Sequence, residues 1–296
     1  MRVGVVDIGT NSMRLLVTDG ITEFGRWVQV TGLGRGVDAS GSLSEEAIEG
    51  TLSVFRRFGD LMAELEVERR MAIATSASRD AGNREPFFDR AEKALGMRPT
   101  LISGHQEARF AYQGATTDRE LDRPMVVSDI GGGSSEFVSA ADEVSIDIGS
   151  VRLTERILAS RPASHSEMDR ARSLLDDMFE EVEVGPVGTL VGVAGTWTSI
   201  AAIAQELSVY DRERVDGYSL SRDRLSQVTS LLSPMTTDET AAIPSLDPKR
   251  APVILAGAVL AGGVMDVLDV ADVVVSERDT LDGAAAHLLA LPLIPT

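Results

Sequence analysis

The sequence has no cysteine, few basic residues for its acidic content and no long apolar run. Without cysteine there is neither a disulfide framework nor a thiolate metal site, so stability depends on packing. The longest apolar stretch, residues 251–264, contains glycine and proline and falls short of a membrane span. The first seven residues enter a strand pattern directly, without a signal-peptide apolar region or cleavage site. These features predict a cytoplasmic protein with no membrane partner.

Acidic residues outnumber basic residues by 46 to 28, which gives a formal net charge of −18. Such a surface repels polyanions at long range, so we expect no nucleic-acid partner. The alternative interpretation is that the negative charge serves only to keep the protein soluble. Salt confines the repulsion to about 8 Å. Arginines and a metal ion inside a cleft are therefore still able to hold phosphate locally.

Two near-copies of one loop are the strongest signal that is present. Residues 3–12 read VGVVDIGTNS and residues 125–134 read MVVSDIGGGS, so that Asp129 lies 122 positions after Asp7. Each apolar run predicts a buried strand, and each small-residue turn lets backbone N–H groups cradle a phosphate oxygen. A single loop of this kind also occurs where a hairpin needs only a turn. Two copies predict a duplicated domain that binds phosphate between its halves.

Strand and helix patterns alternate along the chain. Ser44, followed by two glutamates, predicts the capped start of an amphipathic helix that continues to about residue 66. The other predicted helices in this pattern are 85–95 and 166–182. The predicted strands are 2–7, 13–19, 27–33, 70–74, 124–128, 136–139, 145–148 and 189–194.

The order of these elements indicates the fold class. Three early strands in meander, followed by alternating strand and helix in both halves, predict an α/β fold of mixed sheets flanked by helices. At 296 residues the chain is long enough for about two domains. The polar stretch 114–123 has little apolar periodicity, so we place the boundary there, with domains 1–118 and 119–296. We expect the last helix, about 284–296, to pack back on the first domain.

Five motifs lie in order along essentially the whole chain. They are 7–12 (DIGTNS), 74–80 (ATSASRD), 102–108 (ISGHQEA), 129–136 (DIGGGSSE) and 192–196 (GVAGT). The set resembles the exopolyphosphatase and guanosine pentaphosphate phosphatase (Ppx/GppA) family of the actin-like, sugar-kinase and Hsp70 ATPase superfamily. The resemblance implies two ribonuclease-H-like domains with an interdomain cleft, Mg²⁺ dependence and hydrolysis of phosphoanhydride bonds.

Glu107 is the predicted catalytic base. It follows Ser103 and Gly104 at a strand-to-helix turn, where a carboxylate can orient or deprotonate an attacking water. The family's usual acidic neighbour is missing, since His105 and Gln106 precede Glu107, which leaves one carboxylate in this motif. The alternative is a first-turn helix acid that complements the helix dipole.

Asp7, Asp129 and Glu136 form the predicted metal-associated group, and the last two are also predicted to be catalytic. Mg²⁺ prefers hard carboxylate oxygens and usually contacts one or two carboxylates together with substrate phosphate. The metal would neutralise nonbridging oxygens and help to position water. The alternatives are an aspartate that caps its own turn and, for Glu136, a solvated strand position.

Phosphate positioning is assigned to the two loops, to Thr75 and Ser76, and to two arginines, because phosphoryl transfer depends on positioning and charge stabilisation. Arg79 is the strongest cation, since a guanidinium binds phosphate bidentately. Its alternative is a helix-start ion pair with Asp80 or Glu85, and the alternative for Arg14 is a solvated strand face. The predicted phosphate-binding residues are Gly9, Thr10, Asn11, Ser12, Arg14, Thr75, Ser76, Arg79, Gly131, Gly132, Gly133 and Ser134.

A third loop resembles the adenosine-side loop of the superfamily. Its residues are Gly192, Gly195 and Thr196, and they would lie on the nucleotide side of the site. The alternative is that the two glycines only permit close helix packing.

The main functional prediction is a hydrolase that uses Mg²⁺, or another divalent cation, to release terminal orthophosphate from polyphosphate by base-activated water. The chain ends after motif 276–283 and one helix, without the further helical domains of long exopolyphosphatases, which favours short polyphosphate. The near alternative is guanosine pentaphosphate (pppGpp) 5′-phosphohydrolase activity. An alternative of another class is a nucleotide-binding regulatory module without turnover. A homodimer is an expectation from the family only.

Overall fold

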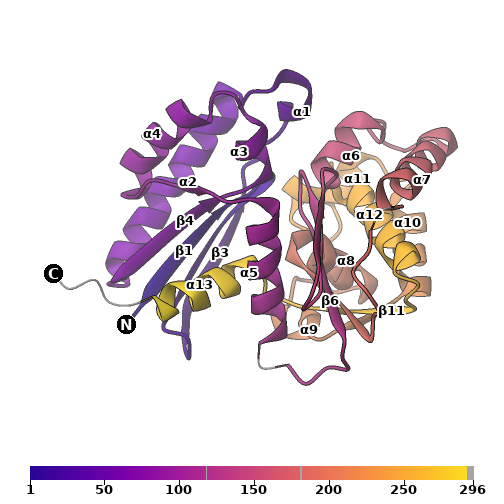
Figure 1. The fold of residues 1–296 in the computed structure, drawn as a ribbon. Coiled ribbons are helices and arrows are strands. Elements are labelled where there is room, and N and C mark those ends of the chain that lie inside the picture. The colour runs from indigo at the N-terminus through magenta and orange to yellow at the C-terminus, as the bar shows by residue number, and fades with distance from the viewer. Residues whose placement is uncertain (118, 181, 292–296) are drawn as a thin grey trace. The chain divides into compact units, whose positions relative to one another are not determined.

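A computed structural model of the chain describes residues 1–117, 119–180 and 182–291. The chain forms two compact units, each built on one mixed sheet (Figure 1). Unit 1 is Met1–Gly114 together with the segment that begins at Thr280, and unit 2 is Ala115–Asp279. Unit 1 is therefore assembled from both ends of the sequence.

Two predicted limits fall partly on residues outside the described ranges. The predicted domain boundary is at residue 118, and the predicted final helix includes residues 292–296. The described C-terminal helix is α13 (Thr280–Ala290), which begins before the predicted residue 284. The cleft expected between the two domains stays a prediction.

The sheet of unit 1 has five strands. They are β1 (Val3–Ile8), β2 (Ser12–Thr18), β3 (Glu23–Val30), β4 (Arg69–Ala74) and β5 (Thr100–Leu101). Their order is β3-β2-β1-β4-β5, with β1 antiparallel to β2 and parallel to β4, and β4 parallel to β5. Because successive side chains of a strand point to opposite faces, Val6 and Ile8 contribute to one core and Val3 and Val5 to another.

Helices cover both faces of this sheet. They are α1 (Val37–Ser40), α2 (Glu45–Glu64), α3 (Ser76–Asp80), α4 (Arg84–Leu95), α5 (Gly104–Thr116) and α13. Phe55 of α2 and Phe87 of α4 are fully buried in the core of Val6 and Ile8. Each such burial contributes about 1.5–3 kcal/mol. The core of Val3 and Val5 is covered by α13, and Phe110 of α5 packs against it.

The sheet of unit 2 has six strands. They are β6 (Met125–Ile130), β7 (Ser135–Val138), β8 (Glu143–Ile146), β9 (Thr189–Val193), β10 (Ser219–Ser221) and β11 (Asp272–Val275). Their order is β10-β11-β9-β6-β7-β8, in which β9 is parallel to both β6 and β11. The other pairs are antiparallel.

One large core holds the sheet and helices of unit 2 together. The helices are α6 (Ser150–Arg156), α7 (His165–Phe179), α8 (Ala194–Ala204), α9 (Arg212–Val215), α10 (Arg222–Leu232), α11 (Thr237–Ala241), the 3-10 helix η1 (Pro248–Arg250) and α12 (Ile254–Val267). Helices α8 and α12 are apolar on nearly every side because both lie in this core. Trp197 of α8 is fully buried.

The two sheets repeat one strand connection. The order β3-β2-β1-β4-β5 in unit 1 corresponds to β8-β7-β6-β9-β11 in unit 2, with a meander first and parallel strands afterwards. Strand β1 is therefore equivalent to β6, and β2 to β7. The predicted α/β fold of mixed sheets flanked by helices is confirmed.

Strand β3 differs from its prediction. It covers Glu23–Val30 rather than residues 27–33. The N–H groups of Thr31 and Gly32 donate to the Asn11 carbonyl oxygen at 3.0 and 2.9 Å, outside the β2–β3 pairing. These bonds to the first loop end the strand at Val30, which no local apolar pattern reveals.

Candidate functional site

The carboxyl ends of three parallel strands lie side by side in unit 1. Ile8 at the end of β1 pairs in register with Ala74 of β4, and Ala74 pairs with Leu101 of β5. Open parallel sheets commonly bind ligands at this edge. The loop after β1, the start of α3 and the start of α5 follow these strand ends, and they contain three of the predicted motifs.

The first loop is a tight turn built around Gly9. Its N–H donates to the Ser12 carbonyl oxygen at 3.1 Å, and a Cβ on Gly9 would lie 2.9 Å from that oxygen. A side chain at this position would therefore need the turn to shift. The Gly34 N–H donates to the Thr10 carbonyl oxygen at 2.7 Å, which fixes the loop from its other side.

The loop after β4 is hydrogen-bonded directly to the loop after β1. The Thr75 N–H donates to the Ile8 carbonyl oxygen at 3.2 Å, and the Ala77 N–H donates to Thr10 Oγ1 at 3.2 Å. Among the described residues, Asn11 Oδ1 and the hydroxyls of Ser76 and Ser78 are buried without a hydrogen-bond partner. Burying unpaired polar atoms is costly. This cluster therefore suits a polar ligand such as phosphate.

Asp7 and Arg14 form an ion pair. Arg14 Nε donates to Asp7 Oδ2 at 2.8 Å, and the two side chains are only 5% and 14% exposed, respectively. They are opposite residues of β1 and β2, so the register of the hairpin brings them together. The solvated strand face considered for Arg14 is wrong. The metal role of Asp7 and the phosphate role of Arg14 stay predictions. In this structure the two side chains neutralise each other's charge.

Glu107 lies in the first turn of α5 and contacts Arg79. Arg79 NH1 is 2.8 Å from Glu107 Oε2. Burial raises the pKa of Glu107 above its ordinary value, the Arg79 guanidinium opposes this increase, and the nearby Asp7 carboxylate adds to it. A carboxylate with a raised pKa beside hydroxyl-rich loops is a stronger proton acceptor than an ordinary carboxylate.

The second loop copy has the same turn in unit 2. The Gly131 N–H donates to the Ser134 carbonyl oxygen at 3.0 Å, as Gly9 does to Ser12 in unit 1. The start of α6 lies directly on this turn, because the Ser150 N–H donates to the Gly131 carbonyl oxygen at 2.9 Å. The glycines between the two ends of the turn carry no side chain that would cover their backbone groups.

Asp129 and Glu136 are opposite residues of β6 and β7. They are 4% and 1% exposed, and Ser145 Oγ donates to Glu136 Oε1 at 2.9 Å. Like charges directly opposite in a sheet are destabilising, and burial strengthens the effect. Two hard carboxylates in this arrangement suit a divalent cation that keeps waters or substrate phosphate in its other positions.

The described residues do not form a complete protein-only metal cage. Among residues 1–117, 119–180 and 182–291, no group of three or more His, Asp or Glu side chains is arranged to hold a metal ion. The best fit for Mg²⁺ is the pair Asp129 and Glu136, and Asp7 belongs to the other unit with Arg14 as its partner. The predicted three-residue metal group stays a prediction.

The glycines of the predicted nucleotide-side loop are tightly packed. A Cβ on Gly192 would lie 2.7 Å from the Trp197 indole, and one on Gly195 would lie 2.0 Å from Arg250 NH1. Thr196 is buried in α8, which already begins at Ala194 with a left-handed φ of 67°. The contact with the Trp197 ring supports the packing alternative for Gly192, and the nucleotide-side role of all three residues stays a prediction.

One group of polar side chains in unit 2 was not predicted. The Tyr210 hydroxyl donates to Glu277, and Arg212 Nε lies 3.3 Å from the other oxygen of that carboxylate. Burial of the hydroxyl and the Glu277 charge raise the pKa of Tyr210 well above its ordinary value. No sequence signal connects these residues, since 67 positions separate Tyr210 from Glu277.

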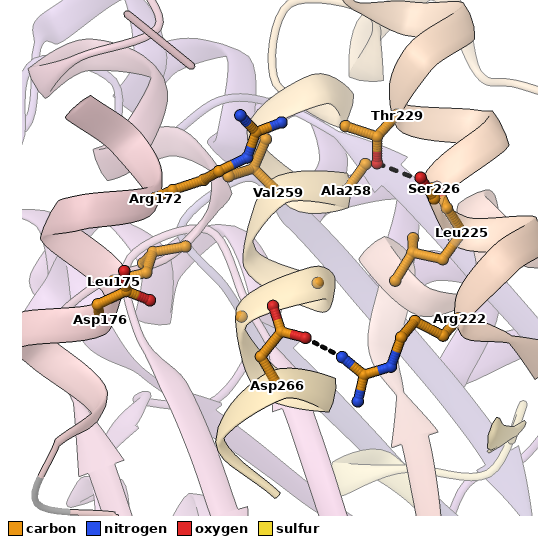
Figure 2. A pocket seen from close by; sticks show the side chains of 12 residues that line it. Arg172, Leu175, Asp176, Arg222, Leu225, Ser226, Thr229, Ala258, Val259 and Asp266 are labelled. Carbon is orange, nitrogen blue, oxygen red and sulfur yellow. Dashed lines mark hydrogen bonds and ion pairs between the residues drawn. The ribbon is translucent and has the colours of Figure 1, made fainter. Parts of the chain in front are cut away.

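A cavity of about 400 Å³ lies between α7, α10 and α12 of unit 2. Figure 2 shows the ion pair of Arg222 and Asp266 on its wall and Arg172 beside Val259. None of the predicted site residues lines this cavity.

In the described part of the chain, no helix is long and apolar enough to cross a membrane.

Known proteins resemble this chain in sequence and in structure. The profile of the Ppx/GppA phosphatase family matches residues 17–288. "Exopolyphosphatase 2" of Mycobacterium tuberculosis is 36% identical over 97% of this chain and 98% of its own. The crystal structure of an exopolyphosphatase-like protein has a TM-score of 0.92 at 34% identity, covering 97% of this chain and 98% of that one. The Aquifex aeolicus family member has a TM-score of 0.80 at 30% identity, covering 98% of each chain. The chain belongs to the Ppx/GppA phosphatase family.

Proposed function

We propose that the protein is an exopolyphosphatase, a hydrolase that removes terminal orthophosphate from inorganic polyphosphate. Family membership gives the reaction class, and the observation that carries the proposal is the Glu107 carboxyl group. It lies at the edge of the unit 1 sheet, is largely buried, has a raised pKa and contacts the strongest predicted phosphate-binding cation, Arg79.

In the proposed reaction Glu107 accepts a proton from water. The water oxygen bonds to the terminal phosphorus as the bridging P–O bond breaks, and the shortened polyphosphate leaves with the bonding electron pair. A raised pKa makes Glu107 a stronger base than an ordinary carboxylate. Ser76, Asn11 and the backbone of the first loop position the phosphate, and Arg79 stabilises the charge that develops on it.

Asp129 and Glu136 are the residues that would hold Mg²⁺. Both are buried carboxylates, and neither belongs to a protein-only cage of three or more ligands among the described residues. When bound, the cation neutralises nonbridging phosphate oxygens. Use of Mg²⁺ in particular, a cytoplasmic location and a homodimer stay predictions.

Phosphate release assays test this function. We expect the protein to release orthophosphate from tripolyphosphate and longer chains with Mg²⁺, and the Glu107→Gln variant to lose about 10²–10⁴-fold in rate. Glu64→Gln, which changes an exposed glutamate of α2, is the matched control and should leave the rate unchanged. Release from pppGpp alone would assign the nucleotide reaction instead. Release from neither substrate, together with tight nucleotide binding, would favour a regulatory module.

A further inference from the structure

The ion pair between Arg79 and Glu107 joins two groups that the proposed reaction needs separately. Arg79 NH1 is 2.8 Å from Glu107 Oε2 and donates to the Ile102 carbonyl oxygen at 3.1 Å. The side chains are 20% and 13% exposed, so a ligand from solvent can reach the pair. While the pair is intact, the guanidinium is bound to a protein carboxylate, and the proposed base is bound to a cation.

We propose that Arg79 is a substrate-operated switch: a substrate phosphate takes its guanidinium and thereby releases Glu107 to act on water. This inference rests on the proposed function, because it assigns the order in which groups of that site act. Without substrate, the ion pair holds the Glu107 carboxylate on the Arg79 guanidinium. With substrate bound, the base becomes free only when the phosphate it serves is in place.

Phosphate is a stronger partner for Arg79 than Glu107 is. Arg79 NH1 contacts Glu107 Oε2, and a phosphate group can accept two parallel N–H bonds from a guanidinium and carries more negative charge than a carboxylate. The Arg79 backbone is anchored, since its N–H donates to the Thr75 carbonyl oxygen at 3.0 Å. The exchange therefore needs only a side-chain movement, within the same loop that is proposed to hold the phosphate.

The exchange also makes Glu107 more basic, as the proposed reaction requires. Arg79 is the main influence that lowers the pKa of Glu107, against burial and Asp7, which raise it. When phosphate takes the guanidinium, the lowering influence weakens and the phosphate charge adds to the increase. Glu107 is then a stronger proton acceptor in the substrate complex than in the free protein.

Binding to catalytically inactive variants separates a switch from a static clamp. If phosphate must displace Glu107 from Arg79, Glu107→Gln removes the competitor, and substrate binds more tightly although turnover is lost. If Arg79 holds both groups at once, the same variant binds equally well or less well. The probe is a tripolyphosphate analogue with methylene bridges, which is not hydrolysed, titrated by calorimetry in Mg²⁺. We expect Glu107→Gln to bind it roughly five-fold more tightly than the unmodified protein.

A double-mutant cycle removes the contribution of simple charge repulsion. In an Arg79→Ala background, Glu107→Gln should change affinity less than about two-fold, because there is no guanidinium to release. Asp80→Asn, which removes an exposed negative charge beside Arg79, is the matched control and should also have little effect. A gain of equal size with and without Arg79, or no gain at all, would overturn the switch while phosphate release still supports the function. No binding and no phosphate release from polyphosphate would overturn both.

Discussion

Asp129 and Glu136 are paired across the β6–β7 hairpin at the position where the equivalent hairpin of unit 1 pairs Asp7 with Arg14. Both pairs are separated by seven positions, and both follow the same strand order. The second member, however, is a cation in unit 1 and an anion in unit 2. Unit 1 thus carries an internal counter-ion for its aspartate. Unit 2 has two buried carboxylates at the same place, an arrangement that suits a bound divalent cation.

This difference predicts opposite effects of Glu136→Gln with and without metal. In EDTA the variant should be more stable than the unmodified protein by about 1 kcal/mol, because one of two negative charges that face each other across the hairpin is removed. Added Mg²⁺ should raise the melting temperature of the unmodified protein more than that of the variant. The Mg²⁺ concentration for half-maximal activity should increase at least ~10-fold in the variant. Identical Mg²⁺ dependence of both proteins would contradict a metal role for this pair.

Removing Arg14 should have the opposite sign. Arg14→Gln leaves the Asp7 carboxylate buried without its counter-ion, so we expect the free energy of unfolding to fall by about 2–4 kcal/mol in urea titrations. Adding Asp7→Asn to this variant should recover part of the loss. Arg90→Gln, which breaks exposed ion pairs with Glu45 and Glu49, is the control and should cost much less. Equal losses for the two arginines would show that burial of the Asp7–Arg14 pair has no energetic consequence.

Local signals were sufficient for much of the fold. Ser44 was predicted as a helix cap, and its hydroxyl accepts from the Ala47 N–H at 3.2 Å at the start of α2. The strand preceding Asp7 was predicted within one residue of β1 at each end. Two boundaries differ from the prediction. Strand β3 ends at Val30 for a non-local reason, because the next two N–H groups donate to the Asn11 carbonyl oxygen. Helix α8 begins at Ala194, the last residue of the predicted strand 189–194.

The site was predictable in its residue types but not in its pairings. The motifs indicated that Arg79, Glu107, Asp7 and Arg14 are functional, yet a helix-start pair with Asp80 or Glu85 was the alternative for Arg79. Its contact with Glu107, 28 positions away, depends on β4 and β5 being adjacent and on the placement of α5. For Gly192, the close contact with the Trp197 ring supports packing, which no motif distinguishes from nucleotide binding.

Two glycines of α12 should respond oppositely to alanine. A Cβ on Gly262 would meet no atom within 4 Å, so Gly262→Ala should stabilise the protein by about 0.5–1 kcal/mol through helix propensity. A Cβ on Gly257 would lie 2.7 Å from Thr196 Cγ2, so Gly257→Ala should destabilise it by about 1–3 kcal/mol. Urea unfolding measures both effects. Phosphate release by Gly262→Ala should be unchanged, and a stabilising Gly257→Ala would contradict the close contact with α8.

The raised pKa of Glu107 predicts that this residue destabilises the folded protein at neutral pH. The folded protein retains the proton of Glu107 above the ordinary pKa of 4.5, so the contribution of this group is most favourable below 4.5 and is lost as pH rises through the raised value. Glu107→Gln cannot ionise. Its free energy of unfolding should therefore match that of the unmodified protein near pH 4 and exceed it at pH 7, in urea titrations across this range.

The same titration determines whether burial or Arg79 dominates at Glu107. Glu64→Gln, at an exposed position, should show no pH-dependent difference from the unmodified protein. If Glu107→Gln were instead less stable than the unmodified protein at pH 7, the ion pair with Arg79 would outweigh the cost of burial, and the pKa of Glu107 would be lowered. Activity should agree with the first outcome, because phosphate release requires ionised Glu107 and should decline as pH falls through its raised pKa.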